Sequence, residues 1–164
     1  MILVSACLLG HKVKYNGGSN TQELLMKYNE RGQFMAVCPE CLGQLPIPRP
    51  PVEIQWADGA AVLAGQARVR SADGSDVTSC FVHGAREVLQ TAAAYGIKIA
   101  ILKENSPSCG VHAVYDGTFQ HKKLAGRGVC ASLLSQQGIR LYSEKDLTPS
   151  LLENLLEEDK NAQQ

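Results

Sequence analysis

Six cysteines in a chain of 164 residues are the groups with the clearest chemical potential. Cys38 and Cys41 form a Cys-Pro-Glu-Cys motif, whereas Cys7 and Cys109 stand alone in the sequence. The chain opens with a short apolar run that lacks the basic residues of a secretory signal, so we expect a cytoplasmic protein. Because cytoplasmic thiols stay reduced, a group of them indicates metal or redox chemistry and argues against disulfides.

The other two cysteines are expected to pack in the interior. Cys130 lies next to Val129 in a segment with helical spacing, and Cys80 lies beside Phe81 at the start of an expected helix. A free cysteine behaves as a small hydrophobic residue in such surroundings. The remaining four cysteines are therefore the candidates for metal or redox chemistry.

The elements that would position these thiols alternate between strand and helix. Apolar runs predict strands at residues 2–4, 34–37, 97–102 and 139–142, and caps or helical spacing predict helices at 21–31, 79–95, 128–137 and 148–158. We expect an edge strand or hairpin arm within 61–70 and a small hairpin that begins at 111–115. The alternation predicts a Rossmann-like α/β fold, with one compact domain at residues 1–158, a mostly parallel sheet flanked by helices, and a polar tail at 159–164.

Cys7, Cys38 and Cys109 each follow the carboxyl end of a predicted strand. Ligands of open parallel sheets bind beyond that end. If the three strands are neighbours, thiols from distant parts of the chain meet at one edge of the sheet. The sequence therefore predicts a thiol-rich site at this edge.

Three kinds of chemistry fit these thiols, and their spacing alone leaves all three open. Cys38 and Cys41 have the spacing of a dithiol pair, which would make the chain a thiol-redox or sulfur-carrier protein. Four thiolates also suit a tetrahedral zinc ion, although structural zinc sites usually combine two close pairs. Thiolates also hold iron–sulfur clusters, and three ligands would leave one iron open as a Lewis acid for a soft sulfur atom.

Polar side chains surround the last of the strand-end cysteines. Residues 103–110 read Lys-Glu-Asn-Ser-Pro-Ser-Cys-Gly and place a cation, a carboxylate, an amide and two hydroxyls around one turn. Hydroxyls can position water and amides can hold the edge of a heterocycle, so Lys103, Asn105 and Ser108 are candidate substrate-binding residues. Glu40 lies two residues after Cys38, and partial burial would raise its pKa enough for proton exchange near neutrality.

The charge balance limits the partners of the chain. It carries 16 basic and 16 acidic residues, so its formal net charge is zero with neutral histidines. This balance argues against broad binding to nucleic acid or to a membrane surface, and the sequence has no apolar run long enough to span a membrane. A local patch that recognises thiolated RNA bases remains an alternative, and it would consist of Lys12, Lys14, Arg31, His121, Lys122, Lys123 and Arg127.

Several motifs occur in order along the chain. They are Ser-Ala-Cys-Leu-Leu-Gly at 5–10, Val-Cys-Pro-Glu at 37–40, Leu-Pro-Ile-Pro-Arg-Pro-Pro at 45–51, Leu-Lys-Glu-Asn-Ser-Pro-Ser-Cys-Gly at 102–110 and Tyr-Asp-Gly-Thr-Phe at 115–119. No single motif is specific for one protein family, but the ordered set of motifs is. Over residues 1–144 the chain resembles the bacterial thiouracil desulfidases.

The resemblance implies a [4Fe-4S] cluster that is held by Cys7, Cys38 and Cys109 alone, with one iron not bound by the protein. It also implies a small thiolated nucleobase or nucleoside as substrate, whose sulfur binds the open iron while water attacks the carbon. Glu40 corresponds to the family's proton-transfer group, and Ser106 to the hydroxyl that orients the water. The implied reaction is a non-redox desulfuration of thiouracil to uracil and hydrogen sulfide.

Two positions depart from the family pattern. Asn16 stands where a basic-Tyr-Asp-Gly turn has aspartate, and Cys41 stands where a residue without a thiol, such as glutamine, is expected. Cys-x-x-Cys spacing is common among cluster ligands. Cys41 therefore raises the alternative that it binds the fourth iron and closes the open position.

Overall fold

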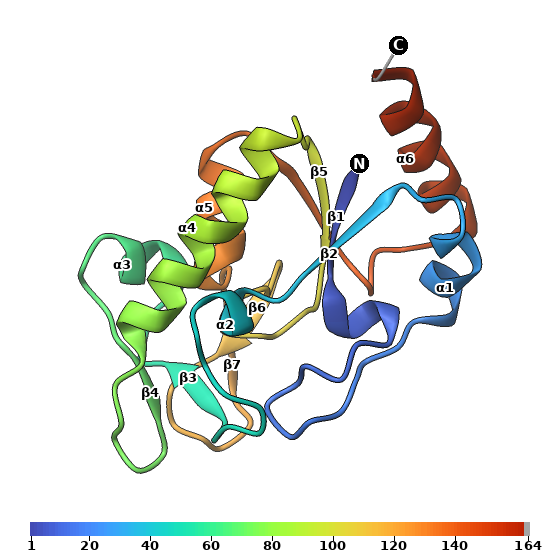
Figure 1. Ribbon diagram of the computed structural model, residues 1–164. Coiled ribbons are helices and arrows are strands. Elements are labelled where there is room, and N and C mark those ends of the chain that lie inside the picture. The colour runs from blue at the N-terminus through green and yellow to red at the C-terminus, as the bar shows by residue number, and fades with distance from the viewer. Residues whose placement is uncertain (163–164) are drawn as a thin grey trace.

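Four parallel strands form the central sheet of the computed structural model, which describes residues 1–162 (Figure 1). They are β1 (Ile2–Ser5), β2 (Phe34–Val37), β5 (Ile99–Leu102) and β8 (Arg140–Ser143), and their order is β2-β1-β5-β8. β1 is therefore the neighbour of both β2 and β5. The four predicted strands and their parallel arrangement are confirmed, with each boundary within two residues of the expected one.

Burial on both faces explains why such short segments form strands. Every residue of β1 and of β5 is buried, which is typical of a parallel sheet that is covered by helices. Successive side chains point to opposite faces of the sheet. Leu3 and Ala100 accordingly lie in one hydrophobic core, while Ile2 and Ile101 lie in the other.

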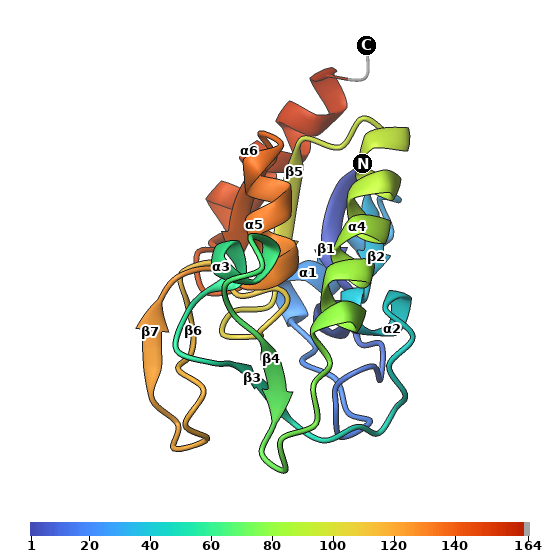
Figure 2. The same ribbon diagram turned by 90° about the vertical axis from the view of Figure 1, so that its left-hand side faces the viewer.

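Helices cover both faces of this sheet. On one face lie α3 (Gly59–Leu63), α4 (Thr78–Ala94) and α5 (Val129–Gln136), and on the other lie α1 (Glu23–Asn29) and α6 (Pro149–Ala162). Figure 2 views the molecule from the side of α3, α4 and α5. Phe81 and Val88 of α4 belong to the first core, and Leu152 and Leu156 of α6 to the second. The predicted Rossmann-like α/β fold is therefore confirmed.

The carboxyl ends of the strands lead into short helices and two small antiparallel sheets. The 3-10 helix η1 (Ala6–Leu9) follows β1, and α2 (Pro39–Leu42) follows β2. β3 (Val52–Ile54) pairs with β4 (Val69–Ser71), and β6 (Ala113–Tyr115) pairs with β7 (Lys123–Ala125), at the lower end of the molecule in Figure 1. The hairpin predicted from residue 111 is confirmed, with a connection that spans residues 116–122.

Two expectations about helices need correction. Residues 59–63 form α3 and not a strand, because the Asp58 carboxylate caps this helix by accepting the Ala61 N–H at 3.2 Å. Only the end of the segment 61–70 enters β4. The last helix does not stop at residue 158 but continues to Ala162, so residues 159–162 of the expected tail are helical. The rest of that tail, residues 163–164, lies outside the described residues.

A long-range ion pair explains the longer last helix. The N-terminal ammonium group of Met1 lies 2.9 Å from Asp159 Oδ1, and the Gln33 side chain donates to Asp159 Oδ2 at 3.0 Å. The helix is thus tied to the start of the chain beyond the position where its apolar pattern ends. None of the helices within residues 1–162 is long and apolar enough to cross a membrane.

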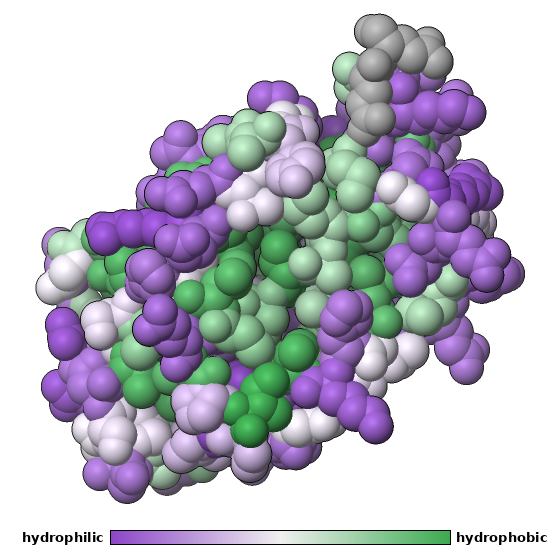
Figure 3. All heavy atoms as spheres, in the orientation of Figure 1, coloured by the Kyte–Doolittle hydropathy of each residue, from purple (hydrophilic) through white to green (hydrophobic). Residues whose placement is uncertain are grey.

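β2 is an edge strand and is less covered than β1. Phe34 and Met35 are half-buried, Ala36 is exposed, and Val37 alone is buried. Figure 3 shows the face that carries α4 and β2, where apolar side chains gather along the middle between polar ones. Pairing with β1 nevertheless aligns Val37 with Ser5, which brings the next residue, Cys38, to the edge of the sheet.

α2 and α4 touch through their backbones. A Cβ atom added at Gly84 of α4 would lie 2.0 Å from the Pro39 carbonyl oxygen, and one added at Gly43 would lie 2.1 Å from the Cys80 carbonyl oxygen. These neighbours are backbone atoms, so no change of rotamer relieves the clash. The two glycines therefore fix the position of the helix that follows Cys38.

We expect the substitution Gly84→Ala to lower the free energy of unfolding by about 1–3 kcal/mol, the usual cost of overpacking, even though alanine favours a helix more than glycine does. Urea unfolding followed by circular dichroism measures this change. The control Gln90→Ala, at an exposed position of the same helix, is expected to change the free energy by less than about 0.5 kcal/mol. Equal stability of the Gly84→Ala variant and the native chain would contradict the close contact.

Candidate active site

A pocket of about 410 Å³ lies at the carboxyl ends of β1, β2 and β5. Its volume is in the range of small-molecule sites. The chain adds β2 on one side of β1 and β5 on the other, so the pocket lies at the switch point where ligands of such sheets bind. Its walls come from residues 5–7, 13–15, 20, 37–40, 49–53, 103–107 and 109, with a few side chains from elsewhere.

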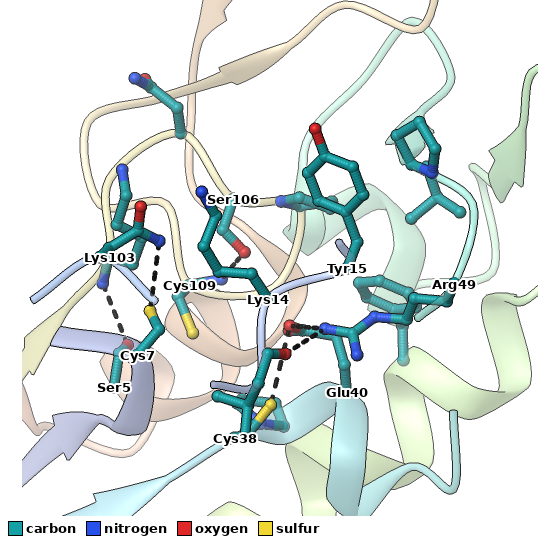
Figure 4. A pocket seen from close by; sticks show the side chains of 18 of the residues that line it. Ser5, Cys7, Lys14, Tyr15, Cys38, Glu40, Arg49, Lys103, Ser106 and Cys109 are labelled. Atoms are coloured by element: carbon teal, nitrogen blue, oxygen red, sulfur yellow. Dashed lines mark hydrogen bonds and ion pairs between the residues drawn. The ribbon is translucent and has the colours of Figure 1, made fainter. Parts of the chain in front are cut away.

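Cys7, Cys38 and Cys109 all line this pocket. Cys7 lies in η1 directly after β1, Cys38 is the N-cap residue of α2, and Cys109 lies in the loop that follows β5. Figure 4 shows their sulfur atoms facing the same cavity from different sides. The structure thus brings together the three thiols that the sequence puts at strand ends.

Burial sets the protonation of these thiols. It raises the pKa of Cys7, raises that of Cys38 to about 12, and raises that of Cys109 well above its ordinary value. The nearby Glu40 carboxylate adds to the rise in the pKa of each thiol. Three thiolates in this pocket would need a compensating positive charge, which bound iron supplies. The donor set therefore fits a metal-containing group.

The three thiols surround the cavity and do not meet at one point. Within residues 1–162, no three His, Cys, Asp or Glu side chains converge closely enough to hold one metal ion. Each thiolate of a [4Fe-4S] cluster binds a different iron, so its ligands surround the group without meeting at one point. Thiols on three segments that face one cavity meet this requirement.

Cys41 is not part of the pocket wall. It is instead the third residue of α2, in the same helical turn as the N-cap residue Cys38, and its side chain contributes to the raised pKa of the Cys38 thiol. The remaining cysteines lie apart from the pocket: Cys130 is fully buried in the core, as expected, whereas Cys80 is only half-buried in α4.

Glu40 presents one fixed and one free carboxylate oxygen. Arg49 Nη2 donates to Oε2 at 3.1 Å, and the Cys38 sulfur lies 3.9 Å from the same oxygen. Oε1 is buried and has no hydrogen-bond partner in the described part of the chain. Burial raises the pKa of this carboxyl group, and the Arg49 charge opposes the rise. The free oxygen of Glu40 is therefore suited to exchange a proton.

Arg49 joins three segments around Glu40. Its side chain is only 8% exposed, and its guanidinium group also donates to the carbonyl oxygens of Val13 at 3.0 Å and Pro46 at 3.3 Å. Its backbone N–H donates to the Tyr15 carbonyl oxygen at 2.7 Å. Sequence reasoning assigned no role to Arg49, because a single cation in a proline-rich stretch gives no periodic signal.

Glu104 holds the loop that carries Cys109. Its side chain is buried, and Oε1 accepts four backbone N–H groups at 2.9–3.2 Å, those of Asn105, Val111, His112 and Ala113. Burial opposes ionisation of Glu104, but the hydrogen bonds outweigh it and lower the pKa of the carboxyl group. One buried carboxylate thus replaces a regular hydrogen-bond ladder in this loop.

Ser106 lines the pocket with a hydroxyl group that can only donate. Its Oγ accepts the backbone N–H groups of Ser108 and Cys109, each at 3.1 Å. A hydroxyl group has two lone pairs and one hydrogen. Both lone pairs are in use, so Ser106 can offer its hydrogen to a bound group but cannot take a proton from it.

The three candidate substrate-binding residues differ in position. Lys103 and Asn105 line the pocket, whereas Ser108 is fully buried and does not. The Lys103 ammonium group already lies 3.1 Å from Glu144 Oε2 and donates to the Glu104 carbonyl oxygen at 2.9 Å. Asn105 lies in the left-handed region at φ 67°. The Ser108 hydroxyl group is buried and has no hydrogen-bond partner in the described part of the chain.

Besides Val13, three residues of the same loop line the pocket without having been assigned to it. They are Lys14, Tyr15 and Asn20, and Asn20 Nδ2 lies 3.5 Å from the Cys7 sulfur. Asn16 of the same loop accepts the Gly18 N–H at 2.9 Å, a contact that an aspartate in its place would also make. The departure from the family pattern at this position therefore preserves the acceptor for the turn.

The fold and the site define the class: an α/β protein with a cysteine-lined pocket at the switch point of a parallel sheet. Residues 2–146 match the model of the 2-thiouracil desulfurase family, and the chain belongs to that family. It is 41% identical in sequence to the solved structure of the [4Fe-4S]-dependent thiouracil desulfidase TudS, with a TM-score of 0.81 over 94% of this chain and 96% of that one. The chain is also 44% identical to YbbK of Bacillus subtilis strain 168, which is described as uncharacterized. This match extends over 151 residues and covers 92% of this chain and 100% of YbbK. The resemblance seen in the motifs is confirmed.

We expect Glu104→Ala to lower the free energy of unfolding by on the order of 3 kcal/mol, because several buried N–H groups lose their acceptor. Chemical unfolding of the metal-free protein measures the effect without interference from a cofactor. The matched control is Glu157→Ala on the exposed side of α6, which should change the stability by less than about 0.5 kcal/mol. If both variants unfold at the same denaturant concentration, Glu104 does not hold the loop.

Proposed function

We propose that this protein is a thiouracil desulfidase that converts a thiolated pyrimidine to uracil and hydrogen sulfide without a change of redox state. The observation that carries the proposal is that three thiols, a half-buried carboxylate and a serine hydroxyl line one pocket in a member of the 2-thiouracil desulfurase family. The likeness to TudS, which is [4Fe-4S]-dependent, supports the same cofactor here. The substrate is a small thiolated nucleobase or nucleoside.

In this proposal Cys7, Cys38 and Cys109 hold a [4Fe-4S] cluster, and one iron has no protein ligand. When bound, the cluster supplies a Lewis acid that takes the sulfur of the substrate. The position of Cys41 supports an open iron, because Cys41 does not line the pocket.

Glu40 and Ser106 have complementary roles in the proposed attack by water. Glu40 Oε1 takes the proton from the water molecule, since it is the buried and unpartnered oxygen of the carboxylate. Arg49 holds Oε2 and so keeps the carboxylate oriented. Ser106 donates its hydroxyl hydrogen to one lone pair of the water, which leaves the other lone pair for the carbon that bears sulfur.

The cofactor is tested first. Protein purified without oxygen should be brown, contain about four irons and about four inorganic sulfides per chain, and release hydrogen sulfide from 2-thiouracil or 4-thiouracil. Cys109→Ala should lose the cluster and its absorbance, while Cys80→Ser, which removes a thiol outside the pocket, should retain both. A colourless native protein that contains one zinc ion would overturn the proposal.

The roles of the two catalytic residues are tested separately. Glu40→Gln and Ser106→Ala should keep the iron and sulfide content, while turnover falls by about 10²- to 10⁴-fold, the usual contribution of proton transfer by a positioned group. The control Glu23→Gln, on the exposed side of α1, should retain turnover. Full activity in both site variants with an intact cluster would refute the assigned roles.

A further inference from the structure

Cys41 has a thiol that the proposed reaction does not use. It is the third residue of α2, and Cys38 is the N-cap residue of the same helix. Side chains at these two positions reach each other, as in a capping box. Here the Cys41 side chain is close enough to Cys38 to contribute to the raised pKa of its thiol. The two thiols of the motif are therefore direct neighbours.

The local backbone has the dimensions that a disulfide needs. Residues three apart in a helical turn have Cα atoms about 5 Å apart, and disulfides join residues whose Cα atoms are about 4.4–6.8 Å apart. Pro39 begins the helix and fixes the backbone between the two thiols. Cys38 and Cys41 are both half-buried, so a small oxidant can reach them.

We propose that Cys38 and Cys41 form a reversible disulfide in the cluster-free protein, and that this bond and the cluster exclude each other. Both need the sulfur of Cys38. This sulfur can bond either to the Cys41 sulfur or to an iron of the cluster, but not to both. The exclusion rests on the proposed function, because it requires that Cys38 is a cluster ligand. Formation of the disulfide does not depend on the proposed function.

Hydrogen peroxide is the oxidant in this proposal. The two S–H bonds and the peroxide O–O bond break, the S–S bond forms, and the two thiol protons leave in two molecules of water. A dithiol reductant reverses the step by exchange and becomes a disulfide itself. The bond would protect Cys38 after cluster loss, since a thiol without a partner is oxidised further to sulfinic acid, which does not return to the thiol.

Cys80 is the competing partner for Cys41. The Cys80 carbonyl oxygen lies against Gly43, directly after α2, and Cys80 is half-buried. Cys109 and Cys130 are buried and less accessible. A matched pair of variants, Cys41→Ser and Cys80→Ser, therefore separates the two disulfides.

The first measurement follows the thiols of cluster-free protein after treatment with hydrogen peroxide, alkylation and peptide mapping by mass spectrometry. We expect the native chain and Cys80→Ser to lose two alkylatable thiols and to yield a peptide that joins Cys38 to Cys41. Cys41→Ser should yield no such peptide and should show sulfinic acid at Cys38. Full retention of free thiols in the native chain, or a bond between Cys41 and Cys80, would overturn the proposal.

The second measurement follows the uptake of iron and sulfide by the same samples. Oxidised native protein should fail to take up a cluster until it is treated with dithiothreitol, which should restore full uptake. Oxidised Cys41→Ser should not be restored. Uptake by disulfide-bonded native protein without reductant would refute the exclusion. A protein that binds no cluster in either redox state would refute the proposed function and the exclusion together, while the peptide map still decides the disulfide.

Discussion

The parallel pairing of β1 with β2 and with β5 is the constraint on which the site depends. It aligns Ser5 with Val37 and Val4 with Ile101, so the three strands end at one edge of the sheet. Burial on both faces of β1 and β5 fixes this register, because a shift by one residue would exchange the side chains between the two cores. Cys7 and Cys38 thus owe their proximity to strand pairing and not to the short loops that hold them.

The pocket collects groups that would be anionic when ionised, and it balances them with few cations. Glu40 lies near the three thiols and raises the pKa of each, and Arg49 is the cation in contact with it. A second carboxylate, the buried Glu104, is neutralised locally by backbone N–H groups. Lys103 lowers the pKa of the Cys7 thiol, but burial outweighs this effect. Burial of the three thiols is favourable with protons on the sulfurs or with iron in their place.

Sequence reasoning succeeded where the signal is local and failed where it depends on distant contacts. Uniform apolar runs predict β1 and β2 almost to the residue, and the chemistry at their ends follows from that. The positions of Arg49 and Glu104 gave no such signal, because their partners are backbone groups that only the folded chain brings near. The short apolar stretch in α3 fits either a strand or a helix, and the Asp58 cap decides in favour of the helix.

The same distinction explains why the role of Cys41 required a structure. Cys-x-x-Cys spacing in an open loop lets both sulfurs approach a cluster, whereas a helical turn places them side by side. Pro39 begins α2 immediately after Cys38, and the backbone contact of Gly84 with Pro39 holds that helix against α4. With the helix fixed, Cys38 faces the pocket and Cys41 faces Cys38. The start of one short helix therefore puts one thiol of the motif in the wall of the pocket and leaves the other outside it.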